Sequence, residues 1–498
     1  MRGGELAIAP ARVAATSALA LILTVAGLVL AAPALGDAPP EPFGHPCTEQ
    51  AVAEGDDVLF CPTGGLDDRV PSFDEDPGPG ETRAPLDVDV TLPGGYKRGD
   101  PPLPTIVMLH GYGGSKEDFE TDSPDGDSED DDILYHYNNV WFAQRGYAVV
   151  NYTARGFGRS CGSIDSASTP ECQKSKSYVH LADQRWEARD TQYLVGLLVD
   201  QGITAPEAIG VTGISYGGGQ SIELAMLRNR IRDFADNSFK PWKSPAGTPL
   251  EISAAYPRWP WSDLISSLLP NGRFLDFRVP PSESASRNPL GIMKKSYVDG
   301  LYALGLQSGT YCGEPPRTPP VCSDFTADLT RYYLRVQAGE PYGAEARRIA
   351  NQVFRFHQGF GLEGRRPAPL LIENGWTDDL FPPKEAIRLY NDIRAEYPKA
   401  PVSIFLGDLG HARASNKENS DRFFNDSAST FFDRRLGGGS GTATAAAPGS
   451  APRALRRGAV TAFTQTCPEP KPANGPFRAP RYSGLGEGTL GFSRNGSQ

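Results

Sequence analysis

Residues 213–217 read Gly-Ile-Ser-Tyr-Gly and join two segments of different pattern. Residues 208–215 form a continuous apolar run typical of a buried strand, and residues 218–230 have helical spacing. A serine at a tight turn between a strand and a helix needs flanking glycines, because only they allow the strained backbone to turn so sharply. The turn then exposes the serine hydroxyl at the edge of the sheet. The pattern therefore predicts a strand, a turn and a helix, with Ser215 exposed at the turn.

A second segment, residues 158–162, reads Gly-Arg-Ser-Cys-Gly and matches the same Gly-x-Ser-x-Gly pattern. Glycine supplies 55 of the 498 residues, so a chance match is not surprising. This segment lies beyond the end of its expected strand, and residues 163–175 are turn-rich rather than helical. We therefore predict Ser215 as the nucleophile and not Ser160.

Strand-like and helix-like segments alternate along the chain, and residues 271–366 interrupt this alternation. The expected strands are 86–93, 103–111, 147–153, 208–215, 368–375 and 401–407, and the expected helices are 133–146, 180–202, 218–230, 383–397 and 419–435. This alternation predicts an α/β fold with a mostly parallel central sheet, flanked by helices and joined by right-handed crossovers. Residues 271–366 mix proline turns with helical pieces and are interpreted as an inserted helical cap.

The expected organisation follows from these patterns and from composition. The segments are a signal peptide at 1–36, an N-terminal extension at 37–84, a first α/β-hydrolase core segment at 85–270, the cap at 271–366, a second core segment at 367–436, a flexible Gly/Ala/Ser-rich linker at 437–452 and a tail at 453–498. The signal peptide rests on Arg2 and Arg12, a long apolar run and small residues before the cleavage point. Because that run is long, an uncleaved membrane anchor stays open as an alternative.

Six of the seven cysteines form three local pairs. The pairs are Cys47 with Cys61, Cys161 with Cys172, and Cys312 with Cys322, while Cys467 is left over. In an exported chain this spacing predicts three disulfides, and it agrees with a secreted or cell-envelope location. Cysteine spacing alone does not prove the connectivity.

The net charge of −11 argues against nucleic acid or an anionic membrane surface as a partner. Zinc-ligand spacings and phosphate-binding loops are missing from the sequence, so neither a metal nor another cofactor is expected. The acidic run at 116–132 lacks the order of a calcium-binding loop and is interpreted as solvated. The expected partner is a small-molecule ester or a short peptide, with membrane contact only through an uncleaved N-terminus; the oligomeric state is left open.

The catalytic base is found by elimination. In an α/β-hydrolase the histidine follows the nucleophile in sequence, which leaves His357 and His411. His357 lies in a helical cap segment, where a packed histidine is the ordinary interpretation. His411 follows the last expected core strand in a glycine-containing loop, from which it could reach the sheet edge. We therefore predict His411 as the base.

The catalytic acid is expected after the preceding strand, 368–375. Asp378 is the predicted acid and Asp379 is the alternative. Glu373 lies within the expected strand and is interpreted as buried and structural. The acid would hold the tautomer of the histidine and stabilise the imidazolium that forms.

The oxyanion hole is expected to use two backbone N–H groups. One belongs to Tyr216, which follows the nucleophile, and the other belongs to Tyr112. Tyr112 lies in the His-Gly-Tyr-Gly-Gly loop at 110–114, which ends an expected strand. His110 in this loop is interpreted as structural and not as the base.

Five separated segments together resemble a known family. They are RGYAVVNYTARGFGRSCG, DQRWEARDTQYLVGLLVDQG, IGVTGISYGGGQSIELA, PWSDLISSLLPNGR and ENGWTDDLFP. The chain resembles the Xaa-Pro dipeptidyl-peptidase-like serine hydrolases, including cocaine-esterase-like acyl esterases, over roughly residues 85–435. The resemblance implies an α/β-hydrolase core with a helical cap, and Ser215, Asp378 and His411 at the triad positions. Members usually carry a C-terminal jelly-roll domain, so residues 453–498 are interpreted as a remnant of such an accessory β domain.

The predicted function is a secreted serine hydrolase that cleaves carboxylic esters or Xaa-Pro-type amide bonds through an acyl-enzyme. Two alternatives stay open: an acyltransferase with the same triad, and a catalytically silent exported binding protein. Dipeptidyl-peptidase activity has less support than general ester or amide hydrolysis, because no residue clearly marks the capture of a substrate ammonium group.

Overall fold

The structure is a computed structural model, which describes nine ranges of the chain. They are residues 38–73, 81–126, 133–270, 290–318, 320–339, 342–360, 364–438, 458–468 and 470–486. The predicted signal peptide, nearly all of the predicted linker and the beginning of the predicted cap, residues 271–289, lie outside these ranges.

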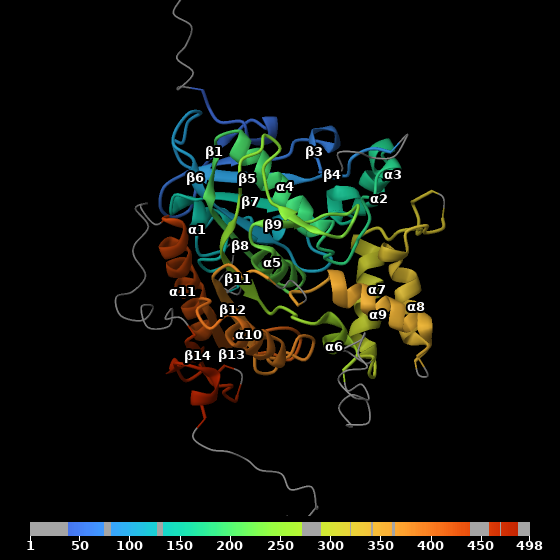
Figure 1. The fold of residues 1–498 in the computed structure, drawn as a ribbon. Coiled ribbons are helices and arrows are strands. Elements are labelled where there is room, and N and C mark those ends of the chain that lie inside the picture. The colour runs from blue at the N-terminus through green and yellow to red at the C-terminus, as the bar shows by residue number, and fades with distance from the viewer. Residues whose placement is uncertain are drawn as a thin grey trace, which may run out of the picture.

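A single sheet of eleven strands forms the centre of the molecule (Figure 1). The strand order is β1-β2-β5-β7-β6-β8-β11-β12-β13-β14-β15. The strands are β1 Thr48–Gln50, β2 Val58–Cys61, β5 Val88–Pro93, β6 Leu103–Leu109, β7 Ala148–Tyr152, β8 Thr204–Ile214, β11 Ile252–Arg258, β12 Leu370–Gly375, β13 Val402–Gly407, β14 Val460–Ala462 and β15 Phe477–Ala479. All neighbours from β7 to β14 are parallel, whereas β5 runs antiparallel to β7. This topology is the predicted α/β-hydrolase fold.

Helices cover both faces of the sheet. They are α1 Asn139–Gln144, α2 Ile164–Ala167, α3 Pro170–Lys174, α4 Glu187–Asp200, α5 Tyr216–Leu227, α6 Leu264–Leu268, α7 Lys295–Ser308, α8 Leu329–Gln337, α9 Ala344–Phe356, α10 Lys384–Glu396 and α11 Glu418–Leu436. Two short antiparallel pairs lie outside the central sheet: β3 Val70–Pro71 with β4 Pro85–Leu86, and β9 Arg230–Arg232 with β10 Phe239–Pro241.

The continuous apolar runs arise because each core strand is buried on both faces. Along β6, Ile106 and Met108 belong to one hydrophobic cluster, which includes residues of α1 and α11. Val107 and Leu109 belong to the other cluster, which includes residues of α4, α5 and α10. Successive side chains of a strand point to opposite faces, so one short segment supplies both cores.

The helix predicted at 180–202 begins only at Glu187, the first residue of α4. Leu181 and Ala182 have positive φ angles of 63° and 56°, which no α-helix accommodates. The Glu187 carboxylate accepts hydrogen bonds from the backbone N–H groups of His180 and Asp183, at 2.8 and 2.9 Å, and so stabilises this non-helical loop. The prediction was wrong here because the side chain of one buried glutamate binds the backbone just before it and so overrides the helical pattern.

Three other predictions need correction. Residues 163–175 hold two short helices, α2 and α3, whose N-cap side chains Ser163 and Thr169 accept from backbone N–H groups. Within residues 133–146, only Asn139–Gln144 is helical. Strand β11, Ile252–Arg258, was not predicted, because its run Ile-Ser-Ala-Ala-Tyr-Pro-Arg is broken by polar residues and a proline.

Both ends of the described chain extend the central sheet. Strands β1 and β2 come from the N-terminal extension, and β14 and β15 come from the tail. Strand β14 pairs in parallel with β13, and Phe463 accepts a hydrogen bond at its carbonyl from the indole N–H of Trp376, at 2.6 Å. Two strands of the tail, which the sequence suggested as a remnant of another domain, thus belong to the core sheet.

Helices α7, α8 and α9 gather at one side of the sheet, with α6 beside them (Figure 1). Helices α7, α8 and α9 come from the segment predicted as a cap.

Three disulfides join the cysteine pairs expected from the sequence: Cys47–Cys61, Cys161–Cys172 and Cys312–Cys322. Cys467 is exposed and has no disulfide partner among the described residues.

We expect Arg258→Met to lower the free energy of unfolding by about 3–5 kcal/mol, measured by urea denaturation. The fully buried Arg258 guanidinium forms ion pairs with Glu373, at 3.1 Å, and with Asp421, and both carboxylates are themselves buried. Without this cation two charges would remain in the core. Arg413→Met is the control, because the Arg413 side chain is 77% exposed and its pair with Asp379 should contribute about 0–1 kcal/mol. Equal losses in the two variants would contradict this account.

Candidate active site

The turn between β8 and α5 holds Ser215 at the sheet edge. Its φ of 57° and ψ of −107° lie outside the regions that non-glycine residues usually adopt. The strained turn is fixed by two backbone bonds, from Ser215 N–H to the Arg258 carbonyl at 3.0 Å and from Gly219 N–H to the Ser215 carbonyl at 2.9 Å. A Cβ at Gly217 would lie 1.9 Å from the Leu109 carbonyl oxygen, so only glycine fits beside β6.

The loop after β13 carries His411, whose imidazole reaches Ser215. The Nε2 atom lies 2.8 Å from Ser215 Oγ, and the Nδ1 atom lies 2.7 Å from Asp378 Oδ2. The rings of Trp259 and Phe381 stand edge-on to the imidazole, with centroids 5.9 and 5.2 Å away. The ring is therefore held between two hydrogen-bond partners and two aromatic side chains.

The loop after β12 holds Asp378 in a fixed orientation. Its Oδ1 atom accepts from the N–H groups of Leu380, at 3.0 Å, and Phe381, at 2.8 Å. Its Oδ2 atom also accepts a hydrogen bond from the backbone N–H of His411, at 3.3 Å. The Asp378 side chain is buried, so the carboxylate is constrained by protein donors on both oxygens.

Asp379, the alternative acid, lies among different partners. Its carboxylate contacts the Tyr297 hydroxyl and the Arg413 guanidinium, the latter at 2.9 Å. Lys294 donates to the backbone carbonyls of Asp379 and Leu380, at 2.7 and 2.9 Å, and so braces this loop. Burial lowers the pKa of Lys294. Of the two neighbouring aspartates, only Asp378 contacts His411 in the structure.

The two predicted oxyanion-hole residues lie next to each other. Tyr216 is the first residue of α5, and backbone N–H groups in the first turn of a helix lack intrahelical partners. The ring centroids of Tyr112 and Tyr216 are 5.5 Å apart. Burial raises the pKa of Tyr216 well above its usual range, so its hydroxyl stays protonated and donates to Glu187 at 3.1 Å. The sequence did not reveal this support from Glu187.

Two of the histidines that were not chosen as the base, His110 and His357, are buried. His110 Nε2 accepts from the Ala154 N–H at 2.9 Å, which leaves Nδ1 to donate to the Gly111 carbonyl at 2.6 Å. His357 bonds through Nδ1 to the Leu181 carbonyl at 2.8 Å. Burial lowers the pKa of both imidazoles, so both are neutral near pH 7.

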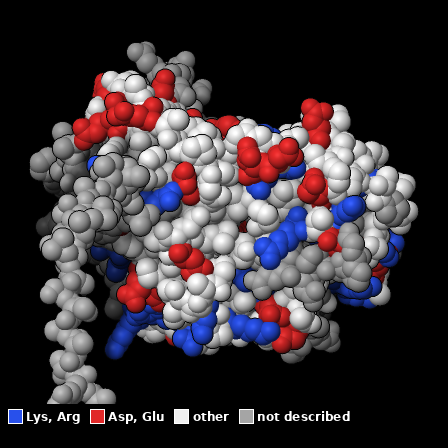
Figure 2. Space-filling model, turned by 90° about the horizontal axis from the view of Figure 1, so that it is seen from above, with Lys and Arg blue, Asp and Glu red and all other residues white. Residues whose placement is uncertain are grey.

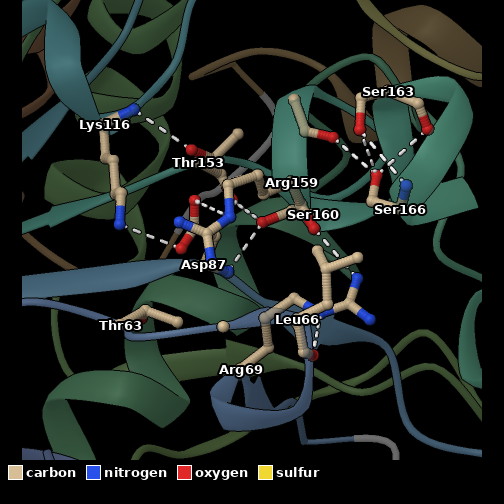
Figure 3. A network of polar contacts seen from close by, with 12 residues as sticks. Thr63, Leu66, Arg69, Asp87, Lys116, Thr153, Arg159, Ser160, Ser163 and Ser166 are labelled. Carbon is tan, nitrogen blue, oxygen red and sulfur yellow. Dashed lines mark hydrogen bonds and ion pairs between the residues drawn. The ribbon is translucent and has the colours of Figure 1, made fainter.

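Ser160, in the second Gly-x-Ser-x-Gly segment, lies in a buried polar network (Figure 3). Its hydroxyl donates to the Thr153 carbonyl at 2.6 Å and accepts from the Asp87 N–H at 2.8 Å. Lys116 joins the same network through the Asp87 carboxylate, at 2.9 Å. Both hydrogen-bonding directions of the Ser160 hydroxyl are thus occupied by structural partners.

A cavity of about 150 Å³ opens beside Ser215, between the sheet edge and the helices of the cap segment. Tyr112, Tyr216 and Trp261 line it from the core side, and aliphatic and aromatic side chains of α6, α7, α8 and α9 line the other side. Sequence reasoning missed this lining. Helical periodicity indicates which face of each cap helix is apolar, but not what that face packs against.

Charged side chains are distributed without a dominant sign on the visible surface. In Figure 2 the basic and acidic side chains of the described residues are interspersed. The described ranges contain no cluster of three or more His, Cys, Asp or Glu side chains that could hold a metal ion. Nor does any helix in these ranges combine the length and apolar composition needed to cross a membrane.

The sequence of residues 83–231 matches the family described as X-Pro dipeptidyl-peptidase (S15 family). This stretch runs from β4 to β9 and includes the turn at Ser215. The chain is a serine hydrolase of the α/β-hydrolase fold. The match bears out the family resemblance seen in the sequence of this hydrolase. No curated protein sequence matches the chain.

Several solved structures are similar to this hydrolase, all at low identity. A post-proline cleaving enzyme from Rickettsia typhi has a TM-score of 0.39 and 16% identity, with 76% of this chain and 38% of that chain covered. An acetyl xylan esterase from Paenibacillus sp. R4 has a TM-score of 0.39 and 12% identity, with 79% of this chain and 88% of that chain covered. An acylaminoacyl peptidase has a TM-score of 0.37 and 15% identity, with 78% of this chain and 47% of that chain covered.

Proposed function

We propose that this hydrolase cleaves carboxylic ester or Xaa-Pro-type amide bonds through a Ser215–His411–Asp378 triad and an acyl-enzyme. The observation that carries the proposal is the unbroken hydrogen-bond chain from Ser215 Oγ to His411 Nε2, at 2.8 Å, and from His411 Nδ1 to Asp378 Oδ2, at 2.7 Å. A nucleophile is activated when an oriented base lies within hydrogen-bond reach of it.

In the acylation step, Ser215 Oγ attacks the substrate carbonyl carbon while His411 Nε2 accepts the hydroxyl proton. Asp378 accepts from the Nδ1–H, which keeps Nε2 free as the acceptor and stabilises the imidazolium that forms. The backbone N–H groups of Tyr216 and Tyr112 donate to the oxyanion of the tetrahedral intermediate. The intermediate then collapses, and the leaving group takes the proton from His411.

In the deacylation step, water replaces the leaving group. His411 Nε2 accepts a proton from water as its oxygen attacks the acyl carbonyl, and the proton is then returned to Ser215 Oγ. The second tetrahedral intermediate occupies the same oxyanion hole. The products are a carboxylic acid and the free enzyme.

We also propose that the protein acts outside the cytoplasm as a secreted or cell-envelope enzyme. The three disulfides support this location, because disulfides persist mainly in oxidising compartments. Its substrate would then be an exogenous ester or short peptide.

The proposed function is tested by treating the purified protein with a fluorophosphonate probe and identifying the labelled residue by peptide mass spectrometry. We expect labelling at Ser215 and turnover of p-nitrophenyl esters. An unlabelled protein without turnover would instead support the catalytically silent binding protein. Products formed with added alcohols in preference to water would support the acyltransferase.

A further inference from the structure

The cavity beside Ser215 is lined by apolar groups. Leu264, Ile265 and Leu268 of α6 face Val298 and Leu301 of α7 across it. Helices α8 and α9 add further aliphatic and aromatic side chains. Among the described residues, no charged side chain lines the cavity.

The tyrosine hydroxyls around the cavity are already bonded to protein groups. Tyr112 donates to the Tyr311 hydroxyl at 2.6 Å, and Tyr311 donates to the Tyr302 carbonyl at 3.2 Å. Tyr332 donates to the Phe325 carbonyl at 2.8 Å. The hydroxyls of Tyr216, Tyr302 and Tyr333 likewise bond to Glu187, Thr330 and Asp299. The tyrosines therefore present mainly their rings to a ligand.

From this lining we propose that the cavity binds the acyl group of the substrate, and that this group is an uncharged hydrocarbon chain of medium length. The proposal rests on the proposed function, because it assumes that Ser215 forms the acyl-enzyme. An ammonium group buried against such a surface would lose its hydration without gaining a counter-ion. A cavity of about 150 Å³ accommodates a group of about six carbon atoms.

The acyl side is favoured over the leaving-group side by the order of events. The acyl group stays attached to Ser215 through deacylation, whereas the leaving group must depart and water must enter. A half-open cavity between the sheet edge and the cap helices, with apolar walls, suits the group that stays. The substrate class is therefore an ester or amide of an uncharged hydrophobic acid, rather than a dipeptide with a free amino terminus.

The first test is a series of p-nitrophenyl esters with acyl chains from acetate to octanoate. Because burying one methylene group favours binding about fourfold, we expect kcat/KM to rise by about 10²-fold from acetate to hexanoate. Ethyl hexanoate should also be a better substrate than hexyl acetate, because only the former carries its chain on the acyl side. A maximum at acetate, or a preference for hexyl acetate, would overturn the proposal.

The second test concerns charge. Acetyl-Gly-Pro-p-nitroanilide should be cleaved faster than Gly-Pro-p-nitroanilide, whose amino terminus is positively charged. Faster cleavage of the free-amine substrate than of its acetylated form would overturn the proposal.

A matched pair of variants tests whether the acyl chain of the substrate lies in the cavity. Leu301→Trp fills the cavity and should lower the hexanoate-to-acetate ratio of kcat/KM at least about tenfold, as expected from losing burial of two or more methylene groups. Leu306, on the same helix α7, is 45% exposed and does not line the cavity, so Leu306→Trp should leave this ratio unchanged. Equal hexanoate-to-acetate ratios in both variants and the wild type would mean that the acyl chain binds elsewhere, and would overturn the proposal.

Failure of this proposal differs from failure of the proposed function. If the fluorophosphonate probe labels Ser215 but the acyl series is flat, only the acyl-cavity proposal fails. If Ser215 is not labelled and no ester is cleaved, both fail together.

Discussion

Ser215→Ala should lower kcat for p-nitrophenyl esters by about 10⁶-fold and abolish labelling by a fluorophosphonate. The variant lacks the only hydroxyl that lies within 2.8 Å of His411 Nε2 in the described structure. The base would then have no proton to accept from a nucleophile, and the acyl-enzyme could not form. Stopped assays with product detection by chromatography would measure the residual rate.

Ser160→Ala is the matched control, because it changes the other serine of the same sequence pattern. The Ser160 hydroxyl bonds to Thr153 and Asp87 in the core, so its loss should lower the free energy of unfolding by about 1–3 kcal/mol. Labelling should persist in the folded variant. Loss of labelling in Ser160→Ala, with Ser215→Ala still labelled, would reverse the assignment.

Asp378→Asn should lower kcat by about 10⁴-fold while the protein remains folded. An amide at this position can donate to His411 Nδ1, which favours the tautomer with its proton on Nε2. That tautomer cannot accept the proton of Ser215. Circular dichroism and thermal unfolding would show whether the fold is kept, and steady-state kinetics would measure the loss.

Asp379→Asn provides the control one residue away. Its carboxylate contacts Tyr297 and Arg413 rather than His411, so we expect kcat to change by less than about tenfold, as for a surface-type interaction. A larger loss in Asp379→Asn than in Asp378→Asn would show that the acid has been assigned to the wrong neighbour.

Local sequence patterns were sufficient to predict much of the core. Ser215, Asp378 and His411 were assigned because each follows a segment with the continuous apolar pattern of a buried parallel strand. In a parallel sheet such segments end at the same edge, so the residues after them come together in space. The predicted α/β-hydrolase fold is confirmed by the strand order, even though β11 was not predicted.

What the sequence did not reveal depends on contacts between distant segments. The loop at 180–186 interrupts a helical pattern because Glu187 and the Tyr216 hydroxyl bind its backbone; Tyr216 OH accepts from Ala182 N–H at 2.8 Å. The cavity lining combines faces of four helices whose mutual packing has no signature in any one of them. Local patterns predict the individual strands and helices of this molecule, whereas tertiary contacts decide the shape of the cavity beside Ser215.

The pairing of β14 with β13 gives the C-terminal segment a protective role. Strand β13 is buried along its whole length, and without β14 its backbone would present an open, apolar edge. Such an edge is a template for pairing with other chains and for aggregation. The same segment accepts a hydrogen bond from the indole N–H of Trp376, two residues before Asp378. A chain shortened before residue 458 would therefore lose solubility and the support of the loop that carries Asp378 together.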